Sequence, residues 1–365
     1  MDNDLLKTSL HDKHVAAEAV MGEEGGWAVP MSYSGALEEA SLAHKAAVLF
    51  DLSHLGRIRI RGDGALELLQ RVCTADVARQ EDDTVLHTLL CNERGGILDE
   101  CRLIRLVNFW VLTCNAMNRE KLLEHLLFQK IPDARVDDQT FKVGQLAVLG
   151  PTAQKILNHV LPISVDNLQP GQAKMGSLMI ANYIAARTSL AGGWGLEVMV
   201  PTMFLARAWD YVMKQTGENA LAPAGMAAWD VLRIEAGRCR YGHELHEAVD
   251  PITAGLRSSV SFDHDFLGAE ALKNVLKKGP SRRRVLMVGG KTAPSGKPVT
   301  TSIPLMGTNV IGKEDRHVGE ITSATFSPTY ERPLAMAYVA TDVAEPQTTL
   351  RVENAGAWRI EKVFE

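Results

Sequence analysis

The sequence has few cysteines, and they form no recognisable pattern. They are Cys73, Cys91, Cys101, Cys114 and Cys239, an odd number that includes no C-x-x-C pair. The disulfide framework of a secreted domain and a paired-cysteine zinc site both need regular cysteine pairs. We therefore interpret the thiols as small buried apolar groups in a protein of a reducing compartment.

Long apolar runs and an excess of positive charge are also missing. No run of about 18 apolar residues is present that would suit a membrane helix. The first residues, "MDNDLLKTSLHDKH", lack the apolar core of a secretory signal. Lysine and arginine total 39 against 44 acidic residues, giving a net charge of −5. We expect a cytoplasmic protein whose partners include neither nucleic acid nor a membrane.

What the sequence does contain is an interleaved helix and strand pattern over 365 residues, too long for one ordinary core. Apolar residues recur at helical spacing in "EEASLAHKAA", "NREKLLEHLL", "PTAQKILNHVL" and "TMFLARAWDYVM". Residues 84–115 have the pattern of a three-stranded meander. "GRIRIRG" alternates strictly, which predicts Ile58 and Ile60 inside and Arg57, Arg59 and Arg61 in water. Antiparallel sheets with scattered helices favour an α+β fold.

The amino-acid composition changes near residues 277–300, where "KKGPSRRR" and "GGKTAPSGKP" indicate a linker and a loop. Short strand patterns follow to the end of the chain. We therefore predict one region over 1–279 and an all-β domain over 280–365.

An acidic pair interrupts an apparently buried strand in "CNERGGILDECRL". Asp99 shares a strand face with the apolar Ile97 and Leu103, whereas Glu100 shares the other face with Arg102, which can neutralise it. An unpaired carboxylate on an apolar face is costly to bury. Asp99 is either a cap of the preceding glycine turn or a catalytic or ligand-orienting acid.

Two further charged residues stand in apolar settings. In "AAWDVLRIEAG", read as a helix that ends at Gly237, Arg233 lies on an apolar stripe. Its head either reaches the surface or meets a carboxylate, ligand or partner. Glu197 begins an apolar strand in "GGWGLEVMVP", where an acid is usually solvated. "HELHE" spaces its histidines by three residues instead of the four of a zinc-protease motif, so we assign no metal site.

Several segments, in order, resemble the aminomethyltransferase family, the T-protein of the glycine cleavage system. They are "GGWAVPMSY", "EEASLAHKAAVLFDLSHLG", "NERGGILDE", "NAMNREK", "LAVLGPTA", "LRIEAGRCRYGHELHEAVDPITAGL", "DFLGAEAL" and "GEITSATFSPTYERPLAMAYV". The resemblance implies a three-lobed cloverleaf fold. Two interleaved mixed α/β lobes would bind folate in a channel, and a C-terminal all-β barrel would follow.

In that family a ring nitrogen of tetrahydrofolate attacks an aminomethyl group carried on the lipoyl arm of a partner, the H-protein, and ammonia leaves. The family's catalytic acid aligns with Asp99, which would orient the nucleophile and stabilise developing positive charge. The resemblance further implies that Glu197 accepts hydrogen bonds from the pterin edge, that Asn115 adds a polar contact, and that Arg233 holds a ligand or a catalytic carboxylate. Glu100 is expected to be structural.

The chain also departs from the family pattern. His87 replaces a tyrosine, Leu190 an aromatic residue, Gly193 an acid and Trp229 an arginine. His87 and Leu190 are counted with the folate-binding positions, and the surroundings of the one-carbon donor differ. Two alternatives to aminomethyl transfer stay open on these grounds: a tetrahydrofolate-dependent demethylase of a small O-, S- or N-methyl donor, and a non-catalytic folate-binding protein.

Overall fold

A computed structural model describes residues 5–178, 181–188, 193–214, 221–290 and 307–365. The chain forms two compact units. Unit 1 comprises Met1–Thr88 and Glu100–Trp229, and unit 2 comprises Leu89–Asp99 and Asp230–Glu365. Among the described residues, no helix is long and apolar enough to cross a membrane.

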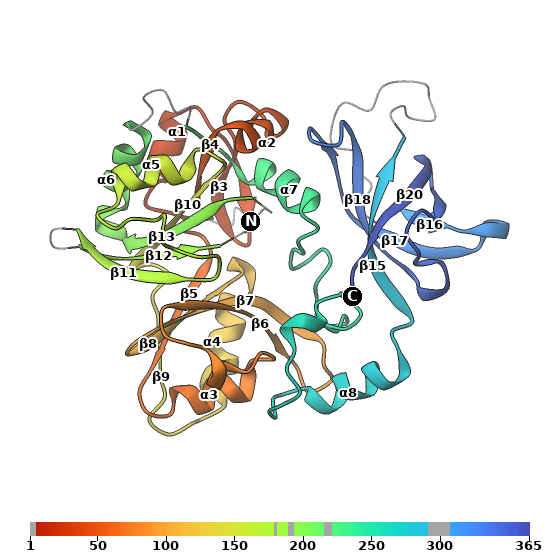
Figure 1. The fold of residues 1–365 in the computed structure, drawn as a ribbon, viewed down its shortest axis with the longest axis horizontal. Coiled ribbons are helices and arrows are strands. Elements are labelled where there is room, and N and C mark those ends of the chain that lie inside the picture. The colour runs from red at the N-terminus through yellow and green to blue at the C-terminus, as the bar shows by residue number, and fades with distance from the viewer. Residues whose placement is uncertain (1–4, 179–180, 189–192, 215–220, 291–306) are drawn as a thin grey trace. The chain divides into compact units, whose positions relative to one another are not determined.

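Unit 1 contains a sheet in the order β11-β12-β13-β10-β4-β14. Its strands are β4 (Ala47–Asp51), β10 (Val143–Leu149), β11 (Ala173–Leu178), β12 (Ala181–Arg187), β13 (Gly195–Pro201) and β14 (Leu221–Pro223). Helices α5 (Ala153–Val160) and α6 (Thr202–Lys214) lie over this sheet (Figure 1). Their apolar stripes, with Ile156 and Leu205 buried, complete a core with the strands. Both helices confirm the predicted spacing.

A second sheet, which belongs to unit 1 except for residues 89–91 of β6 and 97–99 of β7, runs in the order β6-β7-β8-β5-β9. Its strands are β5 (Gly56–Arg61), β6 (Thr84–Cys91), β7 (Ile97–Leu106), β8 (Phe109–Cys114) and β9 (Arg135–Asp138). The predicted meander is confirmed by β6, β7 and β8. The remaining elements of unit 1 are α1 (His11–Ala16), α2 (Ala36–Lys45), α3 (Ala65–Val72), α4 (Arg119–Phe128), β1 (Leu6–Lys7), β2 (Val20–Glu24) and β3 (Trp27–Ser32).

The two larger sheets of unit 1 share an apolar cluster. Ile104 of β7 and Val111 of β8 pack with Ala186 of β12 and Met199 of β13. Side chains two residues apart lie on the same face of a strand. The residues two positions before Ile104 and Met199 are Arg102 and Glu197, so both belong to the faces on which the sheets meet.

The prediction that Arg57 faces water was wrong, because its side chain is fully buried. The Nη2 group donates to the carbonyl oxygens of Ser53 at 2.8 Å and Thr140 at 2.7 Å. Burial lowers the pKa of Arg57 to about 10. Strict alternation therefore identified the strand correctly but misassigned one residue, since backbone acceptors can accommodate a buried guanidinium, whereas Arg59 and Arg61 are partly exposed as predicted.

Unit 2 contains the predicted C-terminal barrel, closed in the order β15-β18-β17-β16-β19-β20 (blue in Figure 1). Its strands are β15 (Arg282–Gly289), β16 (Asn309–Ile311), β17 (His317–Ser327), β18 (Arg332–Ala340), β19 (Thr349–Val352) and β20 (Gly356–Val363), and the barrel encloses its own apolar core. Helix α8 (Ala269–Lys278) precedes it, and α7 (Met226–Glu235) carries the unit boundary. The mixed sheets and the barrel confirm the α+β fold class.

Candidate active site

Asp99 lies near the start of β7 and is fully buried. The turn that precedes it is capped by another side chain: Asn92 Oδ1 accepts hydrogen bonds from the backbone N–H groups of Arg94 and Gly96, both at 3.0 Å. The flanking residues Ile97 and Leu98 are buried too. The structure thus places a carboxylate in a water-poor setting, where its field is weakly screened.

The opposite face of β7 carries two charged residues whose partners lie on other strands. Glu100 Oε1 lies 2.6 Å from His87 Nε2 of β6. Arg102 Nη2 donates to Glu197 Oε2 of β13 at 2.9 Å. The prediction that Arg102 neutralises Glu100 along the strand missed both of these pairings, because cross-strand neighbours are invisible in the sequence.

Glu197 is the centre of a buried polar group in unit 1 and is only 2% exposed. Besides Arg102, Thr188 Oγ1 donates to Glu197 Oε1 at 2.8 Å and Gln145 Nε2 donates to Oε2. The expectation that this strand-end acid is solvated was wrong. Glu197 shares a face of β13 with Met199, which packs against Ile104 and Val111 of the second sheet, so its side chain is enclosed between the two sheets.

Two buried polar atoms beside this group have no hydrogen-bond partner among the described residues: Gln145 Oε1 and Thr113 Oγ1. Thr113 of β8 pairs with Arg102 across the sheet, so both share one face. Buried polar atoms are nearly always satisfied in proteins. Their clustering around Glu197 marks a place that can accept additional donors.

Arg233 of α7 is 2% exposed, so its head does not reach the surface. It donates from Nε to Asp230 at 2.8 Å, from Nη1 to Glu244 at 2.7 Å and from Nη2 to Ser323 at 2.7 Å. The two acids and burial act on the charge in opposite directions, and the pKa of Arg233 is raised despite its desolvation. The sequence allowed the Arg233 head either to reach the surface or to meet a carboxylate, and the structure shows contact with carboxylates.

The remaining positions singled out in the sequence are Asn115, Trp229, Leu190 and Gly193. Asn115 follows β8 and is partly buried. Trp229 packs edge-on against Phe50, with ring centroids 5.1 Å apart. Leu190 lies outside the described residues, while Gly193 is exposed. The cation of Arg187 lies over the Trp194 ring at 5.6 Å.

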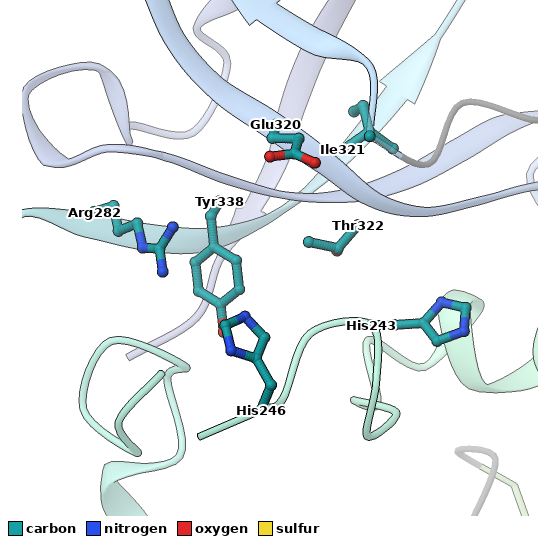
Figure 2. Close-up of a pocket in the computed structure, with 8 residues that line it drawn as sticks. His243, His246, Arg282, Glu320, Ile321, Thr322 and Tyr338 are labelled. Atoms are coloured by element: carbon teal, nitrogen blue, oxygen red, sulfur yellow. The ribbon is translucent and has the colours of Figure 1, made fainter. Parts of the chain in front are cut away.

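The "HELHE" histidines line a pocket of about 250 Å³ in unit 2 (Figure 2). Its lining residues are His243, His246, Arg282, Gly307, Glu320, Ile321, Thr322 and Tyr338. Burial, followed by nearby arginines, lowers the pKa of His243, and burial with Arg282 lowers that of His246. No metal-binding cluster occurs among the described residues.

A buried hydrogen-bonded chain in unit 1 was missed by sequence reasoning. Tyr33 Oη lies 2.7 Å from His14 Nδ1, and His14 Nε2 lies 3.0 Å from Asp51 Oδ2. Asp51 belongs to "FDLSHLG", and His14 stands in an N-terminal segment that reads as polar. An acid at the end of an otherwise apolar strand was the available signal.

Family comparisons agree with this architecture. A family model described as "GCVT N-terminal domain" matches residues 10–264, and one described as "Glycine cleavage T-protein C-terminal barrel domain" matches 296–363. The chain belongs to the glycine cleavage T-protein family of aminomethyltransferases. The resemblance predicted from the sequence motifs is confirmed, and with it the identification of the chain as an enzyme of this family.

Individual relatives of the family cover nearly the whole chain. An aminomethyltransferase of Desulforamulus reducens is 32% identical over 351 residues, covering 96% of this chain and 94% of the relative. One from Symbiobacterium thermophilum is 33% identical, covering 93% and 90%. The structure of glycine cleavage system aminomethyltransferase T from Bartonella henselae matches with a TM-score of 0.89 at 28% identity, covering 98% of this chain and 97% of that one.

Proposed function

We propose that this chain transfers an aminomethyl carbon from the lipoyl arm of a carrier, the H-protein, to tetrahydrofolate and releases ammonia. The observation that carries the proposal is the fully buried Asp99 in the "GGILDE" segment of a chain that belongs to the T-protein family. Tetrahydrofolate supplies the nucleophilic ring nitrogen. We keep 1–279 as the folate-binding region and 280–365 as the barrel domain in this proposal.

Asp99 is proposed as the catalytic acid. Its buried carboxylate is poorly screened by water, so it can orient an N–H group and stabilise a positive charge that develops beside it. Glu100, on the opposite face, has His87 as a partner and is proposed to be structural. His87 would then border the folate site through this pair.

The residues around Glu197 suit a pterin ring. Its amino-pyrimidine edge has adjacent N–H donors, and Glu197 together with the unpartnered Gln145 Oε1 offers buried acceptors for them. Asn115 is proposed to add a polar contact. Leu190 is retained as a folate-binding position on the resemblance alone. Arg233 would act through the carboxylates that it holds, Asp230 and Glu244.

Turnover of Asp99→Asn with a lipoylated carrier tests the central claim. The amide keeps the shape but loses the charge, so turnover should be abolished while folate affinity stays within about tenfold of the unmutated protein. Glu100→Gln, a change of the adjacent acid, is the matched control and should retain most activity. Full turnover by Asp99→Asn would exclude the assigned role.

Calorimetric titration with tetrahydrofolate tests the pterin contact separately. Glu197→Ala should weaken binding by about 1.5–3 kcal/mol, because charge-assisted hydrogen bonds are lost. Glu120→Ala, at a side chain that is 81% exposed, is the control and should leave the affinity unchanged. An unaltered affinity in Glu197→Ala would remove Glu197 from the site.

A further inference from the structure

Arg102 uses only part of its hydrogen-bonding capacity. Its side chain is 24% exposed, against 2% for its partner Glu197, so the ion pair reaches solvent through the arginine. Nη2 donates to Glu197 Oε2, and no other hydrogen bond of this guanidinium is formed with the described residues. A guanidinium carries five N–H donors and no acceptor. Arg102 therefore has unused donors beside a buried acid.

The acid behind Arg102 is already well supplied with donors. A carboxylate offers about four lone-pair positions. Arg102, Gln145 and Thr188 occupy three of those on Glu197. A ring that presents two adjacent N–H groups needs one lone-pair position on each carboxylate oxygen. Oε2 already accepts from both Arg102 and Gln145, so one of these two hydrogen bonds has to break when the ring binds. Gln145 is fully buried, whereas Arg102 is partly exposed and has unused donors.

Resting on the proposed function, we propose that Arg102 is a specificity-determining residue that reads the carbonyl oxygen of a 2-amino-4-oxopyrimidine ring held by Glu197. Along one edge such a ring presents an amino group, a ring N–H and a carbonyl oxygen. Glu197 accepts from the first two, and the neighbouring Arg102 donates to the third. The ring N–H takes the position on Oε2 that Arg102 leaves.

This exchange distinguishes between two rings of nearly equal shape. With a carbonyl at position 4, Arg102 loses one bond to Glu197 and gains one to the ligand. With an amino group there, the ring nitrogen carries no hydrogen and faces Glu197 Oε2 as a second acceptor, and the amino group faces Arg102 as a second donor. A site built to donate to a carbonyl should reject the amino analogue, because unpaired buried polar groups are costly.

Calorimetric titration of the full chain with tetrahydrofolate and with its 4-amino-4-deoxy analogue tests the proposal. The titrations are made at about pH 8, where the free diamino ring is uncharged, so that any proton it takes up on binding to Glu197 lowers its affinity. We expect the unmutated protein to prefer the 4-oxo ring by roughly tenfold or more. The preference, not the absolute affinity, is the quantity compared between variants.

Two polar variants of Arg102 separate donor character from charge and size. A glutamine amide either donates or accepts, so Arg102→Gln should reduce the preference by about threefold or more, while the part that comes from the ring N–H bound to Glu197 remains. Arg102→Lys can only donate and should keep most of the preference. Arg105→Gln on the same strand, where Arg105 pairs with Asp82 at 2.7 Å, is the matched control and should behave as the unmutated protein does.

Each possible result bears either on the role of Arg102 alone or on the proposed folate site as a whole. Equal binding of both rings by the unmutated protein, or an undiminished preference in Arg102→Gln, would overturn the role of Arg102 and leave the proposed function standing. Binding of neither ring by a protein with a native circular dichroism spectrum would overturn both. If Arg102→Gln does not fold, loss of the preference in Arg102→Lys also counts against a donor role.

Discussion

Arg233 and Glu244 form an ion pair that is almost completely enclosed within unit 2. Nη1 lies 2.7 Å from Oε2, and the two side chains are 3% and 0% exposed. Glu244 also accepts from Ser323 Oγ at 2.6 Å, from Thr322 Oγ1 at 2.7 Å and from the backbone N–H of Arg240 at 3.0 Å. Each charge therefore depends on the presence of the other.

Removing one member of this pair should be strongly destabilising. We expect Glu244→Ala to lower the free energy of unfolding by about 3–5 kcal/mol, because Arg233 keeps its charge in a buried setting. Urea denaturation measures the loss. Asp342→Ala, which breaks the exposed Arg316–Asp342 pair, is the control and should change the stability by less than about 1 kcal/mol. Similar losses in both variants would contradict the argument.

Arg57 provides a second test of buried charge. Arg57→Met should reduce the free energy of unfolding by about 2–4 kcal/mol, since the carbonyl groups of Ser53 and Thr140 lose their donors. On the same strand, Arg59 is about one-third exposed and pairs with Asp137. Arg59→Met is therefore expected to cost less than about 1 kcal/mol. Equal costs would show that the carbonyl contacts of Arg57 contribute little.

Elements with strong periodicity were predictable from the sequence. The meander of β6, β7 and β8, the helices α5 and α6 and the C-terminal barrel all follow from local spacing and turn residues. These features depend on neighbours close in sequence, which period and turn chemistry describe. The family was likewise predictable, because its motifs are short segments of consecutive residues.

The partners of the charged residues were not predictable. Arg102 lies near Glu100 in the sequence, yet its hydrogen bond goes to Glu197 on another sheet. Arg57 alternates with isoleucines, yet carbonyl groups from two loops enclose it. Such pairings depend on how sheets and loops pack, which no local pattern specifies. The roles of Asp99, Asn115 and Glu197 toward folate come from the resemblance and stay predictions.

Two glycines with positive φ allow the cost of backbone strain to be compared with the cost of a steric clash. Gly237 has φ +67°, and a Cβ placed there would overlap the ring of Phe364. Gly279 has φ +76° with open space around it. Gly279→Ala should cost about 1–3 kcal/mol for the backbone alone, because its ψ of 147° lies outside the left-handed helical well. Gly237→Ala should cost about 1–3 kcal/mol more, because the buried ring has to move. Equal melting temperatures of the two variants would contradict this difference.

Asp51 should make the protein sensitive to acid. Burial alone would raise the pKa of this carboxyl, but the hydrogen bond and charge of His14, with hydrogen bonds from Ser53 and Thr8, outweigh burial and hold the pKa below its usual value. In the unfolded chain the pKa is about 3.9. A depressed folded pKa adds stability above that pH, and the added stability is lost as the pH falls through the folded value.

Asp51→Asn removes the titrating group while keeping most of the shape. Urea denaturation between about pH 6 and pH 3 should show a steeper loss of stability below about pH 4 for the unmutated protein than for Asp51→Asn. The variant is expected to be less stable at pH 6, since the bond to His14 loses its charge. Asp63→Asn, at an exposed acid, should follow the unmutated curve. Parallel acid limbs for the unmutated protein and Asp51→Asn would mean that protonation of other carboxylates accounts for the acid sensitivity.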